Sequence, residues 1–191
     1  VLERFRFDNV TVRAPQEVLF DEAFGTAEIG ADLTLSGTAA EPRLEGQAQT
    51  LSGSIRFSGQ DFTLERAVAE FDPARGALPT LNLAATASFD KGRALGNLDD
   101  NGQTSFVEPP PTDPNFDVQL AISGGFERGI SGRPALDLSP TLSSGAQIQE
   151  AGTPGPRPLS ETELVSLLTL GRLQLDTAVG GDNSLAGTAL E

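Results

Sequence analysis

Apolar and polar residues alternate over much of this chain, most clearly between Leu51 and Phe89. From Leu81 onward every second residue is apolar, and polar residues such as Asn82 stand between them. Successive side chains of a β-strand point to opposite faces, so this segment predicts a strand with one apolar and one polar face. Residues 59–61 (Gly-Gln-Asp) interrupt an earlier alternating stretch and predict a turn between two strands.

The same period of two predicts further strands on both sides of this region. Pro15 is expected to divide residues 1–29 into two strands, and segments 29–37, 44–51 and 116–126 alternate again, with a last strand near Leu142. The chain is therefore predicted to be mainly β, with its strands in residues 1–145. The apolar face is expected to contain Leu33, Leu35, Ile55, Phe57, Phe62, Leu64, Leu81, Leu83, Phe89, Val118, Leu120 and Ile122.

A short motif of the form apolar, any residue, apolar, Ser, Gly occurs three times. It starts at Leu33, at Ile55 and at Leu120, with spacings near multiples of about twenty residues. Such a period indicates a solenoid-like stack of strands, each burying its apolar face against its neighbours. An ordinary β-sandwich produces similar recurrences, so both architectures agree with the pattern.

Residues 91–115 interrupt the strands with loop chemistry, including a run of three prolines. Within them, Asn97, Asp99, Asn101, Gly102 and Glu108 follow the spacing of a calcium-binding loop. The first of these is Asn where Asp is usual, and no helices are predicted on either side. A chance match in a polar loop explains the spacing better than a calcium site does, so no metal site is expected.

Residues 146–158 have the composition of a flexible linker, and residues 159–172 predict the one strong helix. Ser160 at the N-cap and Glu163 at N3 form a capping box, and Gly171 is a suitable C-cap. The apolar residues cover more than one face, so the helix must be buried against something. It is interpreted as a plug over an open end of the sheet or as a docking helix for a partner. The candidate docking residues are Leu164, Val165, Leu167, Leu168, Leu170 and Arg172.

After the helix, residues 173–191 predict one last short strand and a frayed, Gly-rich tail. No stretch is apolar enough to span a membrane, and no signal peptide is visible. The sequence begins abruptly in strand-like residues, so we expect a C-terminal fragment of a longer protein.

Composition narrows the possible functions. The formal net charge of −14 argues against nucleic acid and anionic membrane surfaces as partners, and it suits a soluble β-rich protein. The chain contains no His, no Cys and no Tyr, so the usual general bases, thiol nucleophiles and soft metal ligands are missing. We therefore expect neither an enzyme nor a cofactor-binding protein.

The order of the parts resembles the C-terminal domain of the TamB family, the AsmA-like translocation and assembly module subunit. The residues that carry the resemblance are Gly53–Gly59, Asp61–Leu64, Phe71-Asp72-Pro73, Pro79–Ala84, a strand ending in Ser-Gly at 118–124, Leu138-Ser139-Pro140, and Leu159–Arg172. The last of these is the most specific. The long 91–115 loop and the insertion at 143–158 depart from the family pattern.

The resemblance implies an elongated, curved β-sheet trough with one short C-terminal helix. It implies a periplasmic, inner-membrane-anchored protein of a diderm bacterium whose C-terminal end faces the outer membrane. The anchor would lie outside this chain. The apolar face would then be a groove that carries phospholipid, with an outer-membrane barrel of the TamA type as partner in outer-membrane protein assembly. A structural or β-augmentation scaffold is the alternative, and an enzyme is a distant third.

Overall fold

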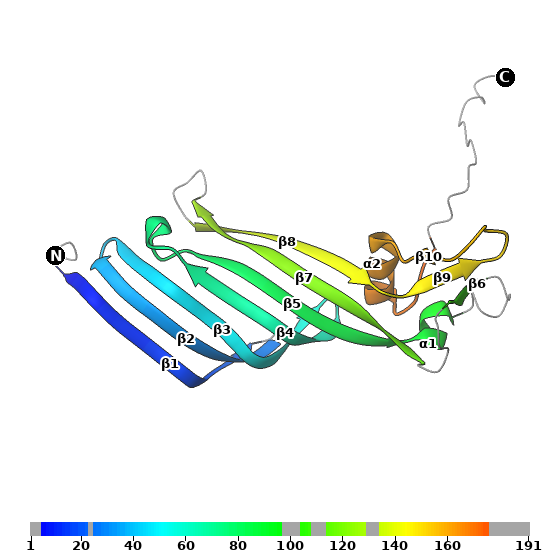
Figure 1. Cartoon of the computed structure of the whole chain (residues 1–191), viewed down its shortest axis with the longest axis horizontal. Coiled ribbons are helices and arrows are strands. Elements are labelled where there is room, and N and C mark those ends of the chain that lie inside the picture. The colour runs from blue at the N-terminus through cyan, green and yellow to red at the C-terminus, as the bar shows by residue number, and fades with distance from the viewer. Residues whose placement is uncertain (1–4, 23–24, 97–103, 108–113, 129–133, 176–191) are drawn as a thin grey trace, which may run out of the picture.

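The computed structural model describes residues 5–22, 25–96, 104–107, 114–128 and 134–175. Seven strands form one open antiparallel sheet in the order β1-β2-β3-β4-β5-β7-β8, and three short strands form a second sheet in the order β10-β9-β6 (Figure 1). The predicted fold class is confirmed: the protein is mainly β, with an open antiparallel sheet and a short helix near the C-terminal end.

The strands are β1 (Arg6–Glu22), β2 (Gly25–Thr38), β3 (Pro42–Phe57), β4 (Gln60–Phe71), β5 (Pro79–Asp90), β6 (Thr104–Phe106), β7 (Asn115–Arg128), β8 (Pro134–Ser144), β9 (Gln147–Glu150) and β10 (Arg157–Pro158). The helical elements are η2 (Pro73–Arg75), α1 (Lys91–Leu95) and α2 (Glu161–Leu170). In the described chain, the large sheet is opposed by no second sheet of similar size. The β-sandwich alternative is therefore wrong.

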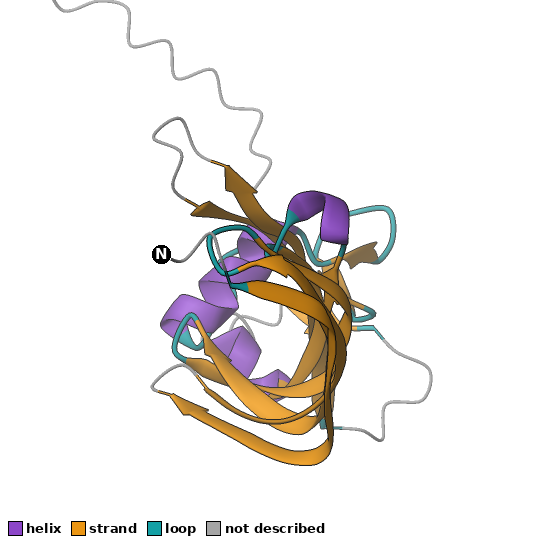
Figure 2. Ribbon diagram, turned by 90° about the vertical axis from the view of Figure 1, so that its left-hand side faces the viewer, coloured by secondary structure: helices purple, strands orange, loops and turns teal. Residues whose placement is uncertain are grey.

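The large sheet is strongly curved, and its strands curl around the side on which α2 lies (Figure 2). Glycine permits this shape at two points where neighbouring strands come very close. A Cβ at Gly46 (φ +123°) would lie 2.2 Å from the carbonyl oxygen of Asp32. A Cβ at Gly124 (φ +149°) would lie 2.1 Å from that of Asp137. Any larger residue at these positions would push the strands apart.

Two strands are longer than the sequence predicted, because bulges absorb the interruptions. β1 continues through Pro15, with a shift of register between Ala14 and Val18. Proline is tolerated there because β1 is an edge strand. On its outer side β1 pairs with no described strand, so a backbone nitrogen without a hydrogen breaks no ladder hydrogen bond. β3 likewise runs on through Leu51, which is the extra residue opposite β2.

Two segments predicted as loop and linker contain secondary structure. Within 91–115, α1 is capped by the Asp90 carboxylate, which accepts a hydrogen bond from the backbone N–H of Arg93 at 2.7 Å. Within 146–158, β9 and β10 pair, because Ile148 is fully buried and Arg157 is held by ion pairs. The linker prediction is therefore wrong for these strands. The five residues with calcium-loop spacing lie outside the described residues.

The strand predicted after the helix is not formed by residues 173–175, and residues 176–191 lie outside the described part of the chain. Instead, the backbone N–H of Leu173 donates to the carbonyl oxygen of Ala94 at 2.7 Å, which ties the end of the helical segment to α1. The Leu173 side chain is buried and belongs to the core cluster. The apolar residues after the helix thus extend the core and add no strand to the sheet.

The hydrophobic core lies at one end of the sheet, beneath α2. Its members come from β4, β5, α1, β7, β8, β9 and α2. The buried cluster consists of Phe62, Ala85, Ala87, Ala94, Leu95, Phe116, Val118, Leu120, Leu142, Ala146, Ile148, Leu159, Leu164, Leu167, Leu168 and Leu173. β1, β2 and β3 contribute no buried member, although Ile55 and Phe57 at the end of β3 pack against the cluster. This asymmetry defines two ends of the molecule.

Candidate functional site

The strand registers place an apolar surface on one face of the large sheet, which we call the concave face. Residues opposite each other in a ladder share a face, and alternate residues of a strand return to it. Leu35 pairs with Leu44, and Leu83 pairs with Ile122. Followed across all ladders, the registers bring the twelve residues predicted from the alternation onto this one face. Phe62, Val118 and Leu120 lie in the core beneath α2 and are at most 1% exposed. The role of this face in binding lipid stays a prediction.

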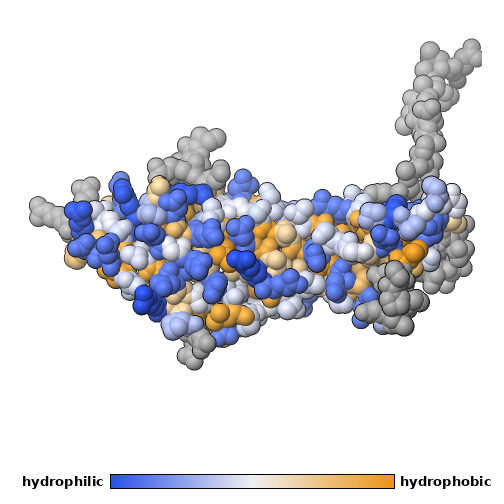
Figure 3. Space-filling view, viewed as in Figure 1, coloured by the Kyte–Doolittle hydropathy of each residue, from blue (hydrophilic) through white to orange (hydrophobic). Residues whose placement is uncertain are grey.

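The concave face is free of charge at its paired positions, as far as the described side chains extend. Its polar members there are Thr50, Gln60 and Ser144. The charged and polar residues lie on the opposite, convex face, where Arg13 pairs with Asp32 at 3.5 Å. In the space-filling view, hydrophobic residues gather along the middle of the molecule between hydrophilic margins (Figure 3).

Helix α2 closes the concave face at one end. Its inner residues Leu164, Leu167 and Leu168 are at most 2% exposed and belong to the core cluster. Val165 and Leu170 point away from the core and are 43% and 54% exposed. The candidate docking residues therefore divide into two groups. Three of them seat the helix, and the other three, including the exposed Arg172, remain accessible.

The ends of α2 are set by local sequence. The predicted capping box is present: the Ser160 hydroxyl accepts from the Glu163 backbone N–H, and the Glu163 carboxylate accepts from the Ser160 backbone N–H. Gly171 adopts the left-handed conformation at the C-cap (φ +70°), and its N–H donates to the carbonyl of Leu167. The helix is therefore specified by its own residues as well as by the core it covers.

An ion-pair cluster, which we call the clasp, joins α2 to the small sheet. Nη2 of Arg157 in β10 donates to a carboxylate oxygen of Glu150 and to one of Glu163, both at 2.6 Å. The Glu163 side chain is fully buried, and it uses its carboxylate for the helix cap and for the clasp together. The pKa of the Arg157 guanidinium is raised above its ordinary value, chiefly by its hydrogen bonds to Glu163.

Away from α2, the concave face remains accessible. Val10, Val12 and Val18 pair with residues of β2 on this face and are 45–50% exposed. Leu33 and Leu35 beside them are half-buried. No described helix or strand packs over these residues, because α2 lies against β8 at the other end. The face thus changes along its length from a packed core to an open apolar trough, which we call the open end.

The sequence predictions missed several members of this site. Val10, Val12 and Val18 alternate in the sequence, yet Pro15 suggested separate short strands. Arg157 was assigned to the linker. The one signal in the sequence for its ion pair is its position six residues before Glu163, the acidic residue of the capping box. The apolar residues of β8 were recognised as strand but not as part of the face.

The described residues contain no group of three or more acidic side chains placed to hold a metal ion. The same residues include no helix with the length and apolar character needed to cross a membrane. The concave face is the candidate site because its paired residues are apolar and, away from α2, accessible.

Comparison with known protein families identifies this chain. The family model of the TamB C-terminal domain matches residues 2–191, which is nearly the whole chain. No match was found among curated proteins or among solved structures.

Proposed function

The chain belongs to the TamB C-terminal domain family, and from this premise we propose that its concave face carries phospholipid acyl chains across the periplasm. Family membership connects the chain with the translocation and assembly module of the bacterial envelope, which acts in outer-membrane protein assembly together with an outer-membrane partner. The proposal adds the cargo and the surface that holds it.

The observation that carries the proposal is the uncharged apolar face that stays uncovered at the open end. Val10, Val12 and Val18 expose about half of their surface there, next to Leu33 and Leu35. Burial of each acyl CH₂ on such a surface is worth about 0.8 kcal/mol. A phospholipid chain that lies along the trough would gain this energy and would cover the side chains that the protein leaves bare.

In this proposal, α2 is the lid of the trough at its closed end. Its buried leucines occupy the space that acyl chains would fill elsewhere, so cargo lies on the open end and does not reach the core. The exposed side of the helix, Val165, Leu170 and Arg172, then faces a barrel partner of the TamA type. The closed end would point toward the outer membrane, and an anchor in the inner membrane would lie outside this chain.

We propose no catalytic role and no cofactor, with phospholipid as cargo only. The experiment is native mass spectrometry of the purified chain, followed by extraction and identification of bound lipid. We expect phospholipid to remain with the protein and to dissociate when the open end is made polar. A chain that carries no lipid after gentle purification, and takes up none from vesicles, would contradict the proposal.

A structural or β-augmentation scaffold is the second candidate, and one observation favours it. β1 and β8 are the outer strands of the large sheet, and neither pairs with a further strand among the described residues, although the backbone N–H of Leu142 in β8 donates to a carboxylate oxygen of Glu161. Unpaired strand edges can accept a further strand from another chain. Pro15 in β1 and Pro134 and Pro140 in β8 lack a backbone N–H, so they reduce the number of hydrogen-bond donors that these strands offer to an added strand. A lipid-free protein that still bound its assembly partner would support this candidate.

A further inference from the structure

The apolar strip on the concave face of β7 and β8 continues from beneath α2 into the open end. On β8, Leu142 is 7% exposed, whereas Leu138 and Leu136 further along the same face are 38% and 52% exposed. On β7, Leu120 is 1% exposed, and Ile122, the next residue on this face, is half-buried. Helix α2 therefore covers one part of a surface whose other part is proposed to hold acyl chains.

The covered part of this surface, which we call the seat, consists of buried core residues on the concave face: Phe62, Val118, Leu120 and Leu142. Leu164, Leu167 and Leu168 of α2 belong to the same buried cluster. An acyl chain on the seat would bury its methylene groups against the residues that these leucines now cover, and burial per unit of apolar area is worth the same for both. Apolar contact alone therefore does not decide whether the helix or an acyl chain occupies the seat.

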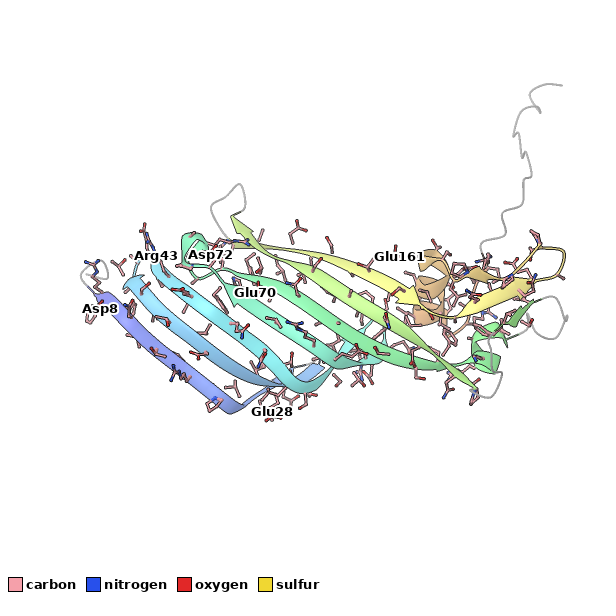
Figure 4. All side chains as sticks on the ribbon, viewed as in Figure 1. Asp8, Glu28, Arg43, Glu70, Asp72 and Glu161 are labelled. Carbon is pink, nitrogen blue, oxygen red and sulfur yellow. The ribbon has the colours of Figure 1, made fainter. Side chains whose placement is uncertain are left out.

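Polar contacts fasten α2 at both of its ends. In the clasp, the guanidinium of Arg157 binds the Glu163 carboxylate through two parallel hydrogen bonds, Nη1 to Oε2 at 2.8 Å and Nη2 to Oε1 at 2.6 Å. Glu161, where α2 meets β8 (Figure 4), accepts a longer bond of 3.4 Å from the backbone N–H of Leu142. Beyond the C-terminal end of the helix, the backbone N–H of Leu173 is bonded to α1. The clasp is the one of these three contacts in which both partners are charged, so it is the strongest of them.

The small sheet supplies the arginine of the clasp and is itself anchored in the core. β9 pairs with β6 on one side and with β10, which begins at Arg157, on the other. Ile148 of β9 is fully buried, and the ring centroid of Phe106 in β6 lies 4.9 Å from that of Phe116 in β7. Arg157 also pairs with Glu150 of β9 at 2.6 Å. The guanidinium is thus fixed to the large sheet through contacts other than those with α2, and it holds the helix from the side.

We infer that α2 is a displaceable lid: the clasp holds it on the seat, and release of the clasp lets acyl chains replace its leucines there. The inference rests on the proposed function and adds regulation of the trough by the chain itself. With the clasp closed the trough ends at α2, and with the clasp open it extends over Leu120 and Leu142. Arg157 is a positioning residue, because it contacts the helix and not the cargo. Loss of its charge leaves Glu163 as a buried carboxylate without its cation, which disfavours the closed state alone.

The test uses tryptophan fluorescence, because the chain contains no tryptophan of its own. Phe62→Trp places the reporter in the seat with a small change of shape, and Leu138→Trp places it in the open end. Each protein is incubated with vesicles of equal phosphatidylglycerol and phosphatidylcholine with brominated acyl chains, which quench tryptophan on contact, and is then re-isolated. We expect quenching at L138W with and without the clasp. Quenching at F62W should rise about threefold when R157M is added, a modest share of the shift that loss of a buried ion pair can produce. R157K, which cannot form the two parallel bonds, should give an intermediate rise.

The matched control is R13M, which removes the surface ion pair with Asp32 and should leave quenching at F62W unchanged; a rise there would reduce the effect to overall charge. Hydrogen exchange of residues 161–170, measured without a reporter, should be faster in lipid-loaded R157M than in the unmodified chain, and this readout holds if F62W does not fold. Unchanged quenching at F62W together with unchanged exchange in R157M would overturn the lid inference and leave the trough intact. Loss of quenching at L138W in R157M would also overturn it, because the clasp would then support the whole trough. Quenching at neither position with the clasp intact would instead contradict the trough.

Discussion

The two ends of the concave face carry the same kind of residue and use it differently. Leu167 at the closed end is 1% exposed, whereas Leu138 at the open end is 38% exposed. The difference is cover: α2 and the small sheet lie over one end, and no described element lies over the other. The apolar sheet face is thus a packed core where α2 covers it and an accessible apolar surface where no described element does. In the proposed function, the accessible part is the surface that holds acyl chains.

The largest expected effect on the free energy of unfolding comes from shortening a leucine at the closed end, compared with the same change at the open end. Leu167→Ala should lower the free energy of unfolding by about 3 kcal/mol, because it leaves a cavity in a packed core. Leu138→Ala is the matched control and should cost less than about 1 kcal/mol, since its side chain is already partly in water. Urea unfolding followed by circular dichroism measures both. Equal losses at the two positions would remove the distinction between the ends.

The next effect concerns the clasp. Arg157→Met leaves the fully buried Glu163 carboxylate without its cation, and we expect a loss of about 2 kcal/mol, reduced from the buried-pair range because Arg157 is partly exposed. Arg56→Met is the control. Arg56 pairs with Asp61 on the surface, so the unfolding midpoint of the R56M variant should equal that of the unmodified chain within error. A stable R157M variant would show that α2 is held by its leucines alone.

A charge placed in the open end separates cargo binding from folding. Leu35→Asp should change the free energy of unfolding by about 1 kcal/mol or less, because water can reach the carboxylate there. Lipid that copurifies should fall severalfold, because acyl chains would have to desolvate the charge. Thr34→Asp, on the convex face of the same strand, is the control and should retain its lipid. Full lipid loading in L35D would argue against the trough as the binding surface.

The smallest effect on stability is expected on the exposed side of the lid. Val165→Ser with Leu170→Ser should alter the free energy of unfolding by about 0.5 kcal/mol or less, since neither side chain is in the core. Binding of the outer-membrane partner should fall in a pull-down assay if this side of α2 docks. Unchanged binding would restrict α2 to its role as a lid, and Thr169→Ser serves as the matched variant.

Much of this comparison could be read from the sequence, because it depends on local rules. Period-two alternation predicted the shared face, and the Ser160 to Glu163 spacing predicted the capping box. The five large apolar residues of the helix predicted burial, and three of them, Leu164, Leu167 and Leu168, are buried. None of these predictions needed knowledge of which segments meet in space.

The features that escaped prediction depend on long-range contacts. The pairing of β9 with β10 in a Gly- and Pro-rich segment is driven by burial of Ile148 and by the clasp. The continuation of β1 through Pro15 depends on a bulge that only the pairing with β2 reveals. The choice of which end α2 covers is a property of the tertiary structure, so alternation alone could not distinguish core from trough.

The most direct test of the trough is photo-crosslinking to lipid at single positions. A photoreactive amino acid is placed at Leu35 or Leu81 on the concave face, at Thr34 or Asn82 on the convex face, and at Leu167 in the closed end. Lipid adducts are then identified by mass spectrometry after irradiation in the presence of vesicles. We predict adducts at Leu35 and Leu81 and none at the other three positions. Adducts of equal yield on both faces, or at the convex positions alone, would contradict an acyl-chain trough on the concave face.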